Sequence, residues 1–171
     1  MIILITGASH TGKTVLAQKL MERHRFPYLS IDHLKMGLIR SGHTQLTPLS
    51  NDEELTTYLW PIVREIVKTA IENKQHLIVE GCYVPSDWQE DFDEGYREHI
   101  RYVCLVMSER YIRSHWEDIQ SHACDIEQRV YDDVDMATLI EDNERYRQQC
   151  EEYGLPFTLI DEDYTDTEKS R

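Results

Sequence analysis

The sequence predicts an α/β fold, with one five-stranded parallel sheet and helices on both of its faces. The chain opens with an apolar run, a glycine-rich loop and a helical pattern, and strand-like runs then alternate with helical patterns. Such alternation favours a parallel sheet whose ligand lies at the carboxyl ends of the strands. A chain of 171 residues, 40% of them apolar, is long enough for one domain with its own core.

Apolar runs predict five strands, at residues 1–5, 26–32, 76–81, 101–107 and 156–161. Helices are expected at 15–24, from His33 onward, at 50–74 and through a long polar region at 109–153. The helix at 50–74 would begin at an N-cap formed by Ser50 or Asn51, and Pro61 interrupts its apolar stripe. We therefore predict a single domain over residues 1–164 and a disordered tail at 165–171.

The loop at residues 7–14 reads GASHTGKT and fits the pattern G-x-x-x-x-G-K-[ST], between a strand and a helix as that pattern requires. In such a loop, backbone N–H groups and the helix N-terminus converge on the α- and β-phosphates of a nucleotide. Lys13 would lie between the β- and γ-phosphates as a catalytic residue, and the Thr14 hydroxyl would bind Mg²⁺. The sequence therefore predicts a site for ATP or GTP with Mg²⁺, formed by Gly7, Ser9, His10, Thr11, Gly12, Lys13, Thr14 and Val15.

Acidic residues end two of the predicted strands. Glu80 ends the run LIVE, which places its carboxylate at the carboxyl edge of the sheet, where it would hold a water bound to Mg²⁺. The alternative for Glu80 is a capping acid at an ordinary strand end. Gly81 would let the substrate approach the backbone. Asp161 and Glu162 end the last strand, with no room afterwards for coupling elements, and we interpret them as solvated acids. The D-x-x-G and N-K-x-D patterns of GTPases do not occur in the sequence.

The region at about residues 32–60 is expected to bind the acceptor substrate. Asp32 would accept a proton from the attacking hydroxyl or orient it, and the alternative is N-capping of the next helix, a position that aspartate favours. Lys35 and Arg40 would hold an acceptor anion, unless they are ordinary exposed charges. The predicted substrate-binding residues are thus Asp32, Lys35, Arg40, Glu80 and Gly81.

These features together resemble the nucleoside monophosphate kinase-like group of P-loop kinases, which includes adenylate, shikimate and gluconate kinases. The stretches IDHLKMGLIR and IENKQHLIVEGCYVP are most similar to the kinase domain of archaeal-type 2-phosphoglycerate kinases. The resemblance implies transfer of the γ-phosphoryl group of ATP to a small metabolite, either 2-phosphoglycerate-like or, as in adenylate kinases, a nucleoside monophosphate. It also implies a mobile lid after the fourth strand, whose arginines close over the nucleotide phosphates.

The expected lid spans about residues 109–133 and contains Arg110 and Arg113, which lie three residues apart and so on one helical face. Their guanidinium groups would act in catalysis by stabilising charge on the transferring phosphoryl group, and closure would exclude water. The alternative is surface ion pairing with Glu109, Glu117 and Asp118, which contributes little. Arg129, near the end of this region, fits either role.

The net charge indicates which partners the protein can bind, and the cysteine content indicates the cellular compartment. A formal net charge of −14 without a basic patch argues against nucleic acid or a membrane surface as partner, and no apolar run is long enough to span a membrane. Four widely spaced cysteines without C-x-x-C are expected to be free thiols of a cytoplasmic protein. We expect a monomer or homodimer with a small-molecule acceptor. The alternative from another class is an ATP-binding regulatory protein that transfers no phosphate.

Overall fold

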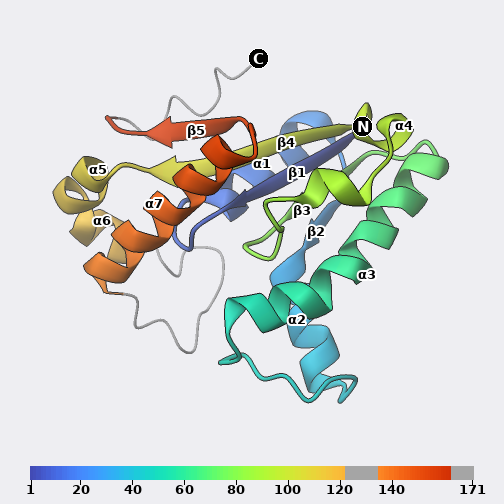
Figure 1. Ribbon diagram of the computed structural model, residues 1–171, viewed down its shortest axis with the longest axis horizontal. Helices are drawn as coiled ribbons and strands as arrows, with labels where there is room; N and C mark the ends of the chain where they lie inside the picture. Colours follow the sequence, from blue (N-terminus) through green and yellow to red (C-terminus); the bar gives the residue numbers. More distant parts are fainter. Residues whose placement is uncertain (122–134, 163–171) are drawn as a thin grey trace.

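A five-stranded parallel sheet forms the centre of the computed structural model, which describes residues 1–121 and 135–162 (Figure 1). Its strands are β1 (Ile2–Gly7), β2 (Tyr28–Ser30), β3 (Leu77–Glu80), β4 (Ile100–Met107) and β5 (Phe157–Ile160). The helices of the described residues are α1 (Lys13–His24), α2 (Ile31–Arg40), α3 (Asp52–Glu72), the 3-10 turn η1 (Trp88–Asp91), α4 (Glu94–Arg97), α5 (Glu109–Ser114), α6 (Trp116–Ser121) and α7 (Met136–Glu152). The predicted α/β fold with five parallel strands is confirmed.

The strands lie in the order β2-β3-β1-β4-β5, so that β1 is central. Ile5 of β1 pairs with Glu80 of β3, and Glu80 pairs in turn with Ser30 of β2. Because parallel strands end at the same edge of a sheet, the last residues of these three strands lie side by side. The loop after β1 therefore leaves from the middle of the carboxyl edge, where a ligand is expected in this architecture.

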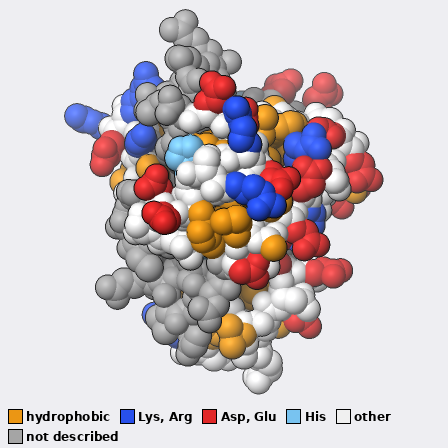
Figure 2. Space-filling view, turned by 90° about the vertical axis from the view of Figure 1, so that its left-hand side faces the viewer, with side chains coloured by type: hydrophobic (Ala, Val, Ile, Leu, Met, Phe, Trp, Pro, Cys, Tyr) orange, Lys and Arg blue, Asp and Glu red, His pale blue; other side chains and the backbone are white. Residues whose placement is uncertain are grey.

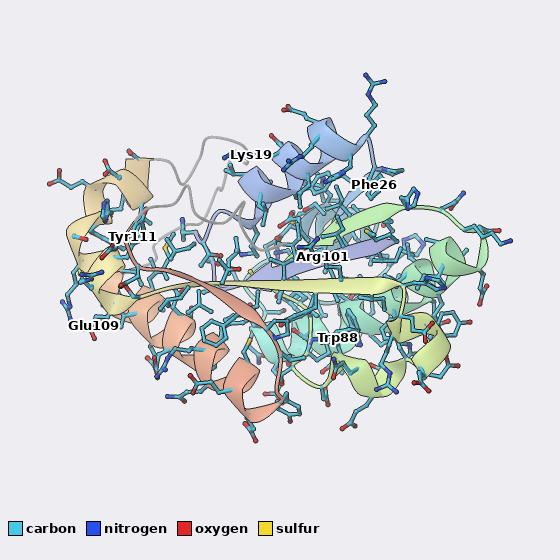
Figure 3. All side chains as sticks on the ribbon, turned by 90° about the horizontal axis from the view of Figure 1, so that it is seen from above. Lys19, Phe26, Trp88, Arg101, Glu109 and Tyr111 are labelled. Carbon is cyan, nitrogen blue, oxygen red and sulfur yellow. The ribbon has the colours of Figure 1, made fainter. Side chains whose placement is uncertain are left out.

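Helices cover both faces of the sheet. Ile2 and Leu4 of β1 belong to the core beneath α3 and the end of α7, whereas Ile3 and Ile5 belong to the core beneath α1. Figure 3 shows α1 on one side of the sheet and α3, α4 and α7 on the other. Burial on both faces explains why β1 consists almost entirely of apolar residues.

The helix α3 starts where its sequence signals predict. Asn51 is its N-cap, and the Asn51 Oδ1 atom accepts a hydrogen bond of 2.8 Å from the backbone N–H of Glu54. Pro61 lies inside the helix without ending it, so the single helix predicted across this residue is confirmed. Pro61 is exposed, and solvent can therefore satisfy the carbonyl that loses its helical partner. No helix in the described parts of the chain, α3 included, is long and apolar enough to cross a membrane.

The second strand is shorter than predicted and covers only Tyr28–Ser30. Ile31 already belongs to α2 and is fully buried, so the chain turns into the helix one residue after the strand ends. Asp32 consequently lies in the first turn of α2 and not at the strand end, and Ser30 occupies the N-cap position. The alternative in which Asp32 caps the helix is wrong.

The described part of the polar helical region at 109–153 consists of the separate helices α5, α6 and α7. His115 lies between α5 and α6 with φ −120°, and the Ser114 hydroxyl donates to the carbonyl of Arg110, a bond that competes with regular helical pairing. The helix α7 begins after Asp135, whose side chain caps the N–H of Thr138 at 2.9 Å. Arg129, most of the second half of the predicted lid and the predicted tail fall within 122–134 and 163–171, outside the described residues.

Candidate active site at the carboxyl edge

Glycines determine the path of the loop between β1 and α1. Gly7 has φ 138°, and a Cβ atom there would lie 2.3 Å from the backbone oxygen of Leu105 in β4. Gly12 has φ 78° and occupies the N-cap position of α1, and His10 also has a positive φ, of 61°. Glycine adopts such values at little cost. The loop can therefore turn tightly between the central strand and the start of α1.

Lys13 begins α1 and is 5% exposed. Its Nζ atom donates to the carbonyl oxygen of Ala8 at 2.6 Å, and the Thr11 hydroxyl donates to the same oxygen at 2.8 Å. No carboxylate of the described residues forms an ion pair with this ammonium group. A buried charge without a counter-charge is unfavourable, and the N-terminus of α1 adds partial positive charge. The loop is therefore suited to an anion, and a polyphosphate fits it.

The remaining predicted residues of this loop lie around Lys13. Ser9 and His10 precede it as half-buried loop residues, and Thr14 and Val15 follow it, half-buried, in the first turn of α1. The Thr14 hydroxyl thus lies on the turn of the helix that faces the loop. The structure brings together the full set of residues that the pattern G-x-x-x-x-G-K-[ST] predicted.

Glu80 is a buried carboxylate on the α1 side of the sheet. It is 1% exposed and accepts a hydrogen bond of 2.8 Å from the Tyr28 hydroxyl. Its register partners are Ile5 and Ser30, and Ile5 packs beneath α1, so Glu80 points toward the side that carries Lys13 and Thr14. The Ser30 hydroxyl is buried and makes no hydrogen bond within the described residues. Carboxylate and hydroxyl oxygens in this position fit a Mg²⁺ ion or its bound water.

Gly81 is explained by packing within the protein. A Cβ atom on Gly81 would lie 2.8 Å from the Cβ atom of Ile31. The glycine therefore allows the first residue of α2 to pack against the end of β3. The substrate approach that we expected at this backbone is not needed to explain the glycine.

Asp32, Lys35 and Tyr83 form a hydrogen-bonded cluster beside the ends of β2 and β3. The Lys35 Nζ atom lies 2.5 Å from Asp32 Oδ1 and 2.7 Å from the Tyr83 hydroxyl. Burial lowers the pKa of Lys35, but the charge and the hydrogen bond of Asp32 outweigh it and raise that pKa above its ordinary value. Burial, with the charge of Asp32, raises the pKa of Tyr83 to about 12. Lys35 is therefore the charged partner of Asp32, and Tyr83 is a neutral phenol.

The predicted arginines lie on the surface of the described chain. Arg110 Nη2 lies 2.5 Å from Asp161 Oδ2, and Arg113 Nη2 lies 2.7 Å from Glu109 Oε1. Arg113 thus makes the surface pair considered as its alternative role, whereas Arg110 joins α5 to the end of β5. On the face drawn in Figure 2, basic side chains lie among acidic ones and form no separate patch. Arg40 is exposed at the end of α2, away from Asp32.

Sequence analysis missed three side chains of this edge: Tyr28, Ser30 and Tyr83. Tyr28 and Ser30 alternate along β2, so their common face with Glu80 could have been found once the strand pairing was known. The contact of Tyr83 with Lys35 joins residues that are 48 positions apart, and no sequence pattern indicates it.

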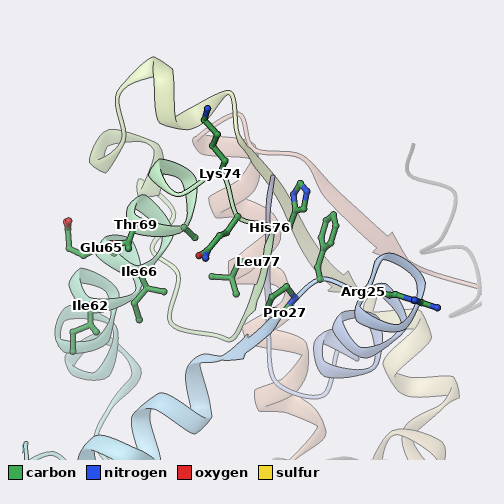
Figure 4. Close-up of a pocket in the computed structure, with 12 residues that line it drawn as sticks. Arg25, Pro27, Ile62, Glu65, Ile66, Thr69, Lys74, His76 and Leu77 are labelled. Carbon is green, nitrogen blue, oxygen red and sulfur yellow. The ribbon is translucent and has the colours of Figure 1, made fainter.

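A groove of about 730 Å³ lies away from this site, between α3 and the segments that precede β2 and β3 (Figure 4). Ile62 and Ile66 of α3 line one side, and Pro27 and Leu77 line the other. The groove is at the amino ends of these strands and contains no predicted site residue. It is therefore separate from the site at the carboxyl edge.

Three solved structures share this fold over nearly the whole chain. A candidate kinase from Chloroflexus aurantiacus has a TM-score of 0.57 and 20% identity, over 97% of this chain and 90% of that chain. A gluconokinase from Sinorhizobium meliloti 1021 has a TM-score of 0.53 and 15% identity, over 96% and 85% respectively. A shikimate kinase from Bacteroides thetaiotaomicron has a TM-score of 0.52 and 14% identity, over 95% and 89%. The predicted resemblance to the P-loop kinase fold is confirmed.

Sequence comparison gives the family. No curated protein is significantly similar in sequence to this chain. A family profile described as AAA domain (AAA_33) matches residues 2–115, two thirds of the 171 residues. The matched span runs from β1 through α5 and contains the phosphate loop, Asp32, Glu80 and Arg110. The chain therefore belongs to the AAA domain family.

Proposed function

We propose that this protein is an ATP-dependent kinase that transfers the γ-phosphoryl group to a small-molecule acceptor. The observation that carries the proposal is Lys13, a buried ammonium group at the N-terminus of α1 that has no carboxylate partner among the residues the structure describes. Such a group is stabilised by the phosphates of a bound nucleotide and costs energy without them. Glu80, on the same side of the sheet, supplies the metal-side carboxylate that nucleotide hydrolysis or transfer requires.

Each residue of the edge has a defined task in this proposal. Lys13 neutralises the charge of the β- and γ-phosphates, while Thr14 and, through water, Glu80 hold Mg²⁺, which would supply charge neutralisation for the phosphoryl group. Asp32 faces the acceptor, with its Oδ1 atom held by Lys35. Arg110 and Arg113 would leave their surface carboxylates and stabilise the transferring group on closure.

The class of acceptor is supported by the proteins that share the fold. Gluconokinase and shikimate kinase are named for small compounds that carry hydroxyl groups. A 2-phosphoglycerate-like acceptor and a nucleoside monophosphate are the finer candidates that the sequence resemblance implies. A cytoplasmic location and a monomeric or dimeric state remain predictions.

Multiple-turnover ADP formation tests the proposal. Purified protein with ATP and Mg²⁺ is assayed with a panel of small hydroxylated acceptors, and Lys13→Ala provides the blank. We expect one class of acceptor to raise ADP formation at least 100-fold over the basal rate, and Lys13→Ala to abolish it. Tight ATP binding with no acceptor-dependent turnover would favour the alternative of an ATP-binding regulatory protein.

A further inference from the structure

The charged residues in the predicted acceptor region indicate which charge the acceptor can have. Within the predicted acceptor region at 32–60, Lys35 and Arg40 are the only lysine and arginine, and the segment 81–92 after Glu80 contains neither residue type. The same two segments contain seven acidic residues: Asp32, Asp52, Glu53, Glu54, Asp87, Glu90 and Asp91. Asp91 is balanced by Arg64 at 2.8 Å, but the excess of acidic residues in these segments still disfavours an acceptor that carries a phosphate or carboxylate, unless a free cation lies nearby.

Lys35 is not a free cation. Its side chain is 12% exposed, its ammonium group donates to both Asp32 and Tyr83, and Asp32 balances its charge. Turning Lys35 toward an anionic acceptor would leave the Asp32 carboxylate, itself 30% exposed, without its partner. The cluster of Asp32, Lys35 and Tyr83 is therefore neutral as a whole.

Arg40 is too far away to replace Lys35. It lies eight residues after Asp32 on the same helix, which corresponds to about 12 Å along the helix axis. Arg40 is also exposed at the end of α2. A small acceptor that contacts Asp32 would not reach its guanidinium group.

The cluster offers hydrogen-bonding groups suited to hydroxyls. Asp32 Oδ1 is held by Lys35, while Asp32 Oδ2 accepts no hydrogen bond from the described residues. The neutral Tyr83 hydroxyl, which accepts from Lys35, can donate its own proton to an acceptor oxygen. The end of β2 lies two strands from the phosphate loop, or about 10 Å, which leaves room for a phosphoryl group between them.

We infer that the acceptor is an uncharged polyhydroxy compound, and not a phosphomonoester or a carboxylic acid. This inference rests on the proposed kinase function and specifies its substrate class. An acceptor hydroxyl oxygen forms a bond to the γ-phosphorus of ATP as the bond from that phosphorus to the β–γ bridging oxygen breaks. ADP leaves with the bond's electron pair, and the hydroxyl proton passes to Asp32 Oδ2 and from there to water.

Acceptors matched in carbon skeleton test the inference with the full chain, ATP and Mg²⁺. Three sets are compared: glucose, gluconate and glucose 6-phosphate; glycerol, glycerate and 2-phosphoglycerate; and adenosine with AMP. In the set that is turned over, we expect the uncharged member to have a kcat/KM at least 10-fold above its charged analogues. A charged member preferred 10-fold, with turnover still abolished by Lys13→Ala, would overturn the inference and keep the proposed function. No transfer to any member would overturn both.

A pair of tyrosine variants tests whether this cluster is the acceptor site. Tyr83→Phe removes the hydroxyl that Lys35 bonds, and Tyr96→Phe removes a matched surface hydroxyl that donates to Glu72 at 2.6 Å. We expect Tyr83→Phe to raise the KM of the uncharged acceptor at least fivefold and to leave the KM of ATP within twofold, whereas Tyr96→Phe changes neither. An unchanged acceptor KM in Tyr83→Phe would overturn the assignment of the cluster to the acceptor.

Discussion

At residue 7 the backbone leaves no room for a side chain. Because a Cβ atom would lie 2.3 Å from the Leu105 oxygen and φ is 138°, Gly7→Ala must separate β1 from β4 or distort the phosphate loop. We expect it to lower the free energy of unfolding by at least about 2 kcal/mol. Urea unfolding followed by circular dichroism measures the change.

Gly37→Ala is the matched control for this prediction. Gly37 lies within α2, is exposed, and a Cβ atom there would meet nothing within 4 Å. Alanine is the better helix former, so this variant should gain up to about 1 kcal/mol. If both substitutions change the free energy of unfolding equally, the close approach of Gly7 to Leu105 is not the cause of the loss in stability.

Single residues also show which parts of the site a sequence can predict. The loop at 7–14 is contiguous, so its spacing alone predicted that Lys13 and Thr14 stand at the start of a helix after the first strand. The position of Glu80 at the carboxyl edge was predictable because it ends an apolar run. The two partners of Lys35 were not predictable in the same way. Asp32 is close to Lys35 in sequence, but only the fold brings Tyr83 to Lys35. The structure also shows that the charge of Lys35 is already balanced by Asp32.

At the scale of elements, the ends of α5 and β5 are joined by one arginine. Arg110 pairs with Asp161, which also accepts a hydrogen bond of 2.6 Å from Ser108 at the N-cap of α5. Arg110 is 62% exposed, and an exposed pair contributes at most about 1 kcal/mol. We expect Arg110→Ala to leave stability within about 1 kcal/mol and to lower kcat at least 100-fold, because we propose that its guanidinium acts in phosphoryl transfer.

Asp161→Asn separates the two roles of Arg110. It weakens the surface pair while keeping the arginine, so kcat should stay within threefold of the unsubstituted protein. If Asp161→Asn lowers kcat as much as Arg110→Ala does, Arg110 acts by holding α5 against β5, and its catalytic assignment fails. Steady-state kinetics and thermal unfolding of both variants provide the comparison.

A second link between elements, from α3 to η1, should depend on pH. Asp91 accepts hydrogen bonds from Trp60 Nε1 at 2.6 Å and from Arg64 at 2.8 Å. Partial burial raises the pKa of Asp91, but these two donors outweigh it and hold that pKa below its ordinary value of 3.8. A lowered pKa in the folded state contributes stability that is fully present above about pH 4 and is lost as the pH falls through the lowered value.

Asp91→Asn should therefore be less stable than the unsubstituted protein at pH 7, by about 1 kcal/mol, since hydrogen bonds to a charged acceptor are the stronger ones. The two proteins should converge in stability as the pH falls through the lowered pKa of Asp91, where both side chains are uncharged. Glu90 is an exposed neighbour of Asp91 in η1, and Glu90→Gln is the control. It should leave the free energy of unfolding unchanged both at pH 7 and at acid pH. A stability difference that persists at acid pH would show that the carboxylate charge is not the cause.

The end of β2 and the break between α5 and α6 could not be predicted from sequence patterns. The strands of the central sheet were found because apolar runs are strong signals, but β2 was placed too long, since an edge strand can end wherever the next residue finds burial, as Ile31 does. The region 109–153 was predicted to be helical, but the break between α5 and α6 was not, because a side-chain hydrogen bond such as that of Ser114 cannot be seen in the pattern of polar and apolar residues.

For the whole molecule, nucleotide binding should be a major source of stability. Lys13 is buried at the centre of the carboxyl edge and has no counter-charge within residues 1–121 and 135–162, so this part of the folded chain without ligand retains an unfavourable charge that phosphates would neutralise. A ligand that binds only the folded state adds about 2.7 kcal/mol at a concentration of 100 Kd. In a chain of this size each kcal/mol raises Tm by about 2–4 °C. Mg²⁺-ADP at 100 Kd should thus raise Tm by about 5–10 °C.

Three controls define the origin of this stabilisation. The net charge of −14 repels anions at long range, so a gain in Tm with ADP must come from the local site and not from general attraction. Adenosine, which lacks phosphates, should raise Tm by less than about 1 °C at the same concentration, and Lys13→Ala should abolish the rise in Tm with ADP.

The metal dependence tests Glu80. Glu80→Gln should reduce the rise in Tm with ADP and Mg²⁺ but leave the smaller rise in EDTA unchanged, since Glu80 is proposed to act on the nucleotide through the metal. Equal stabilisation by adenosine and ADP would place the main binding energy on the base, and Lys13 would then have to be explained without a phosphate.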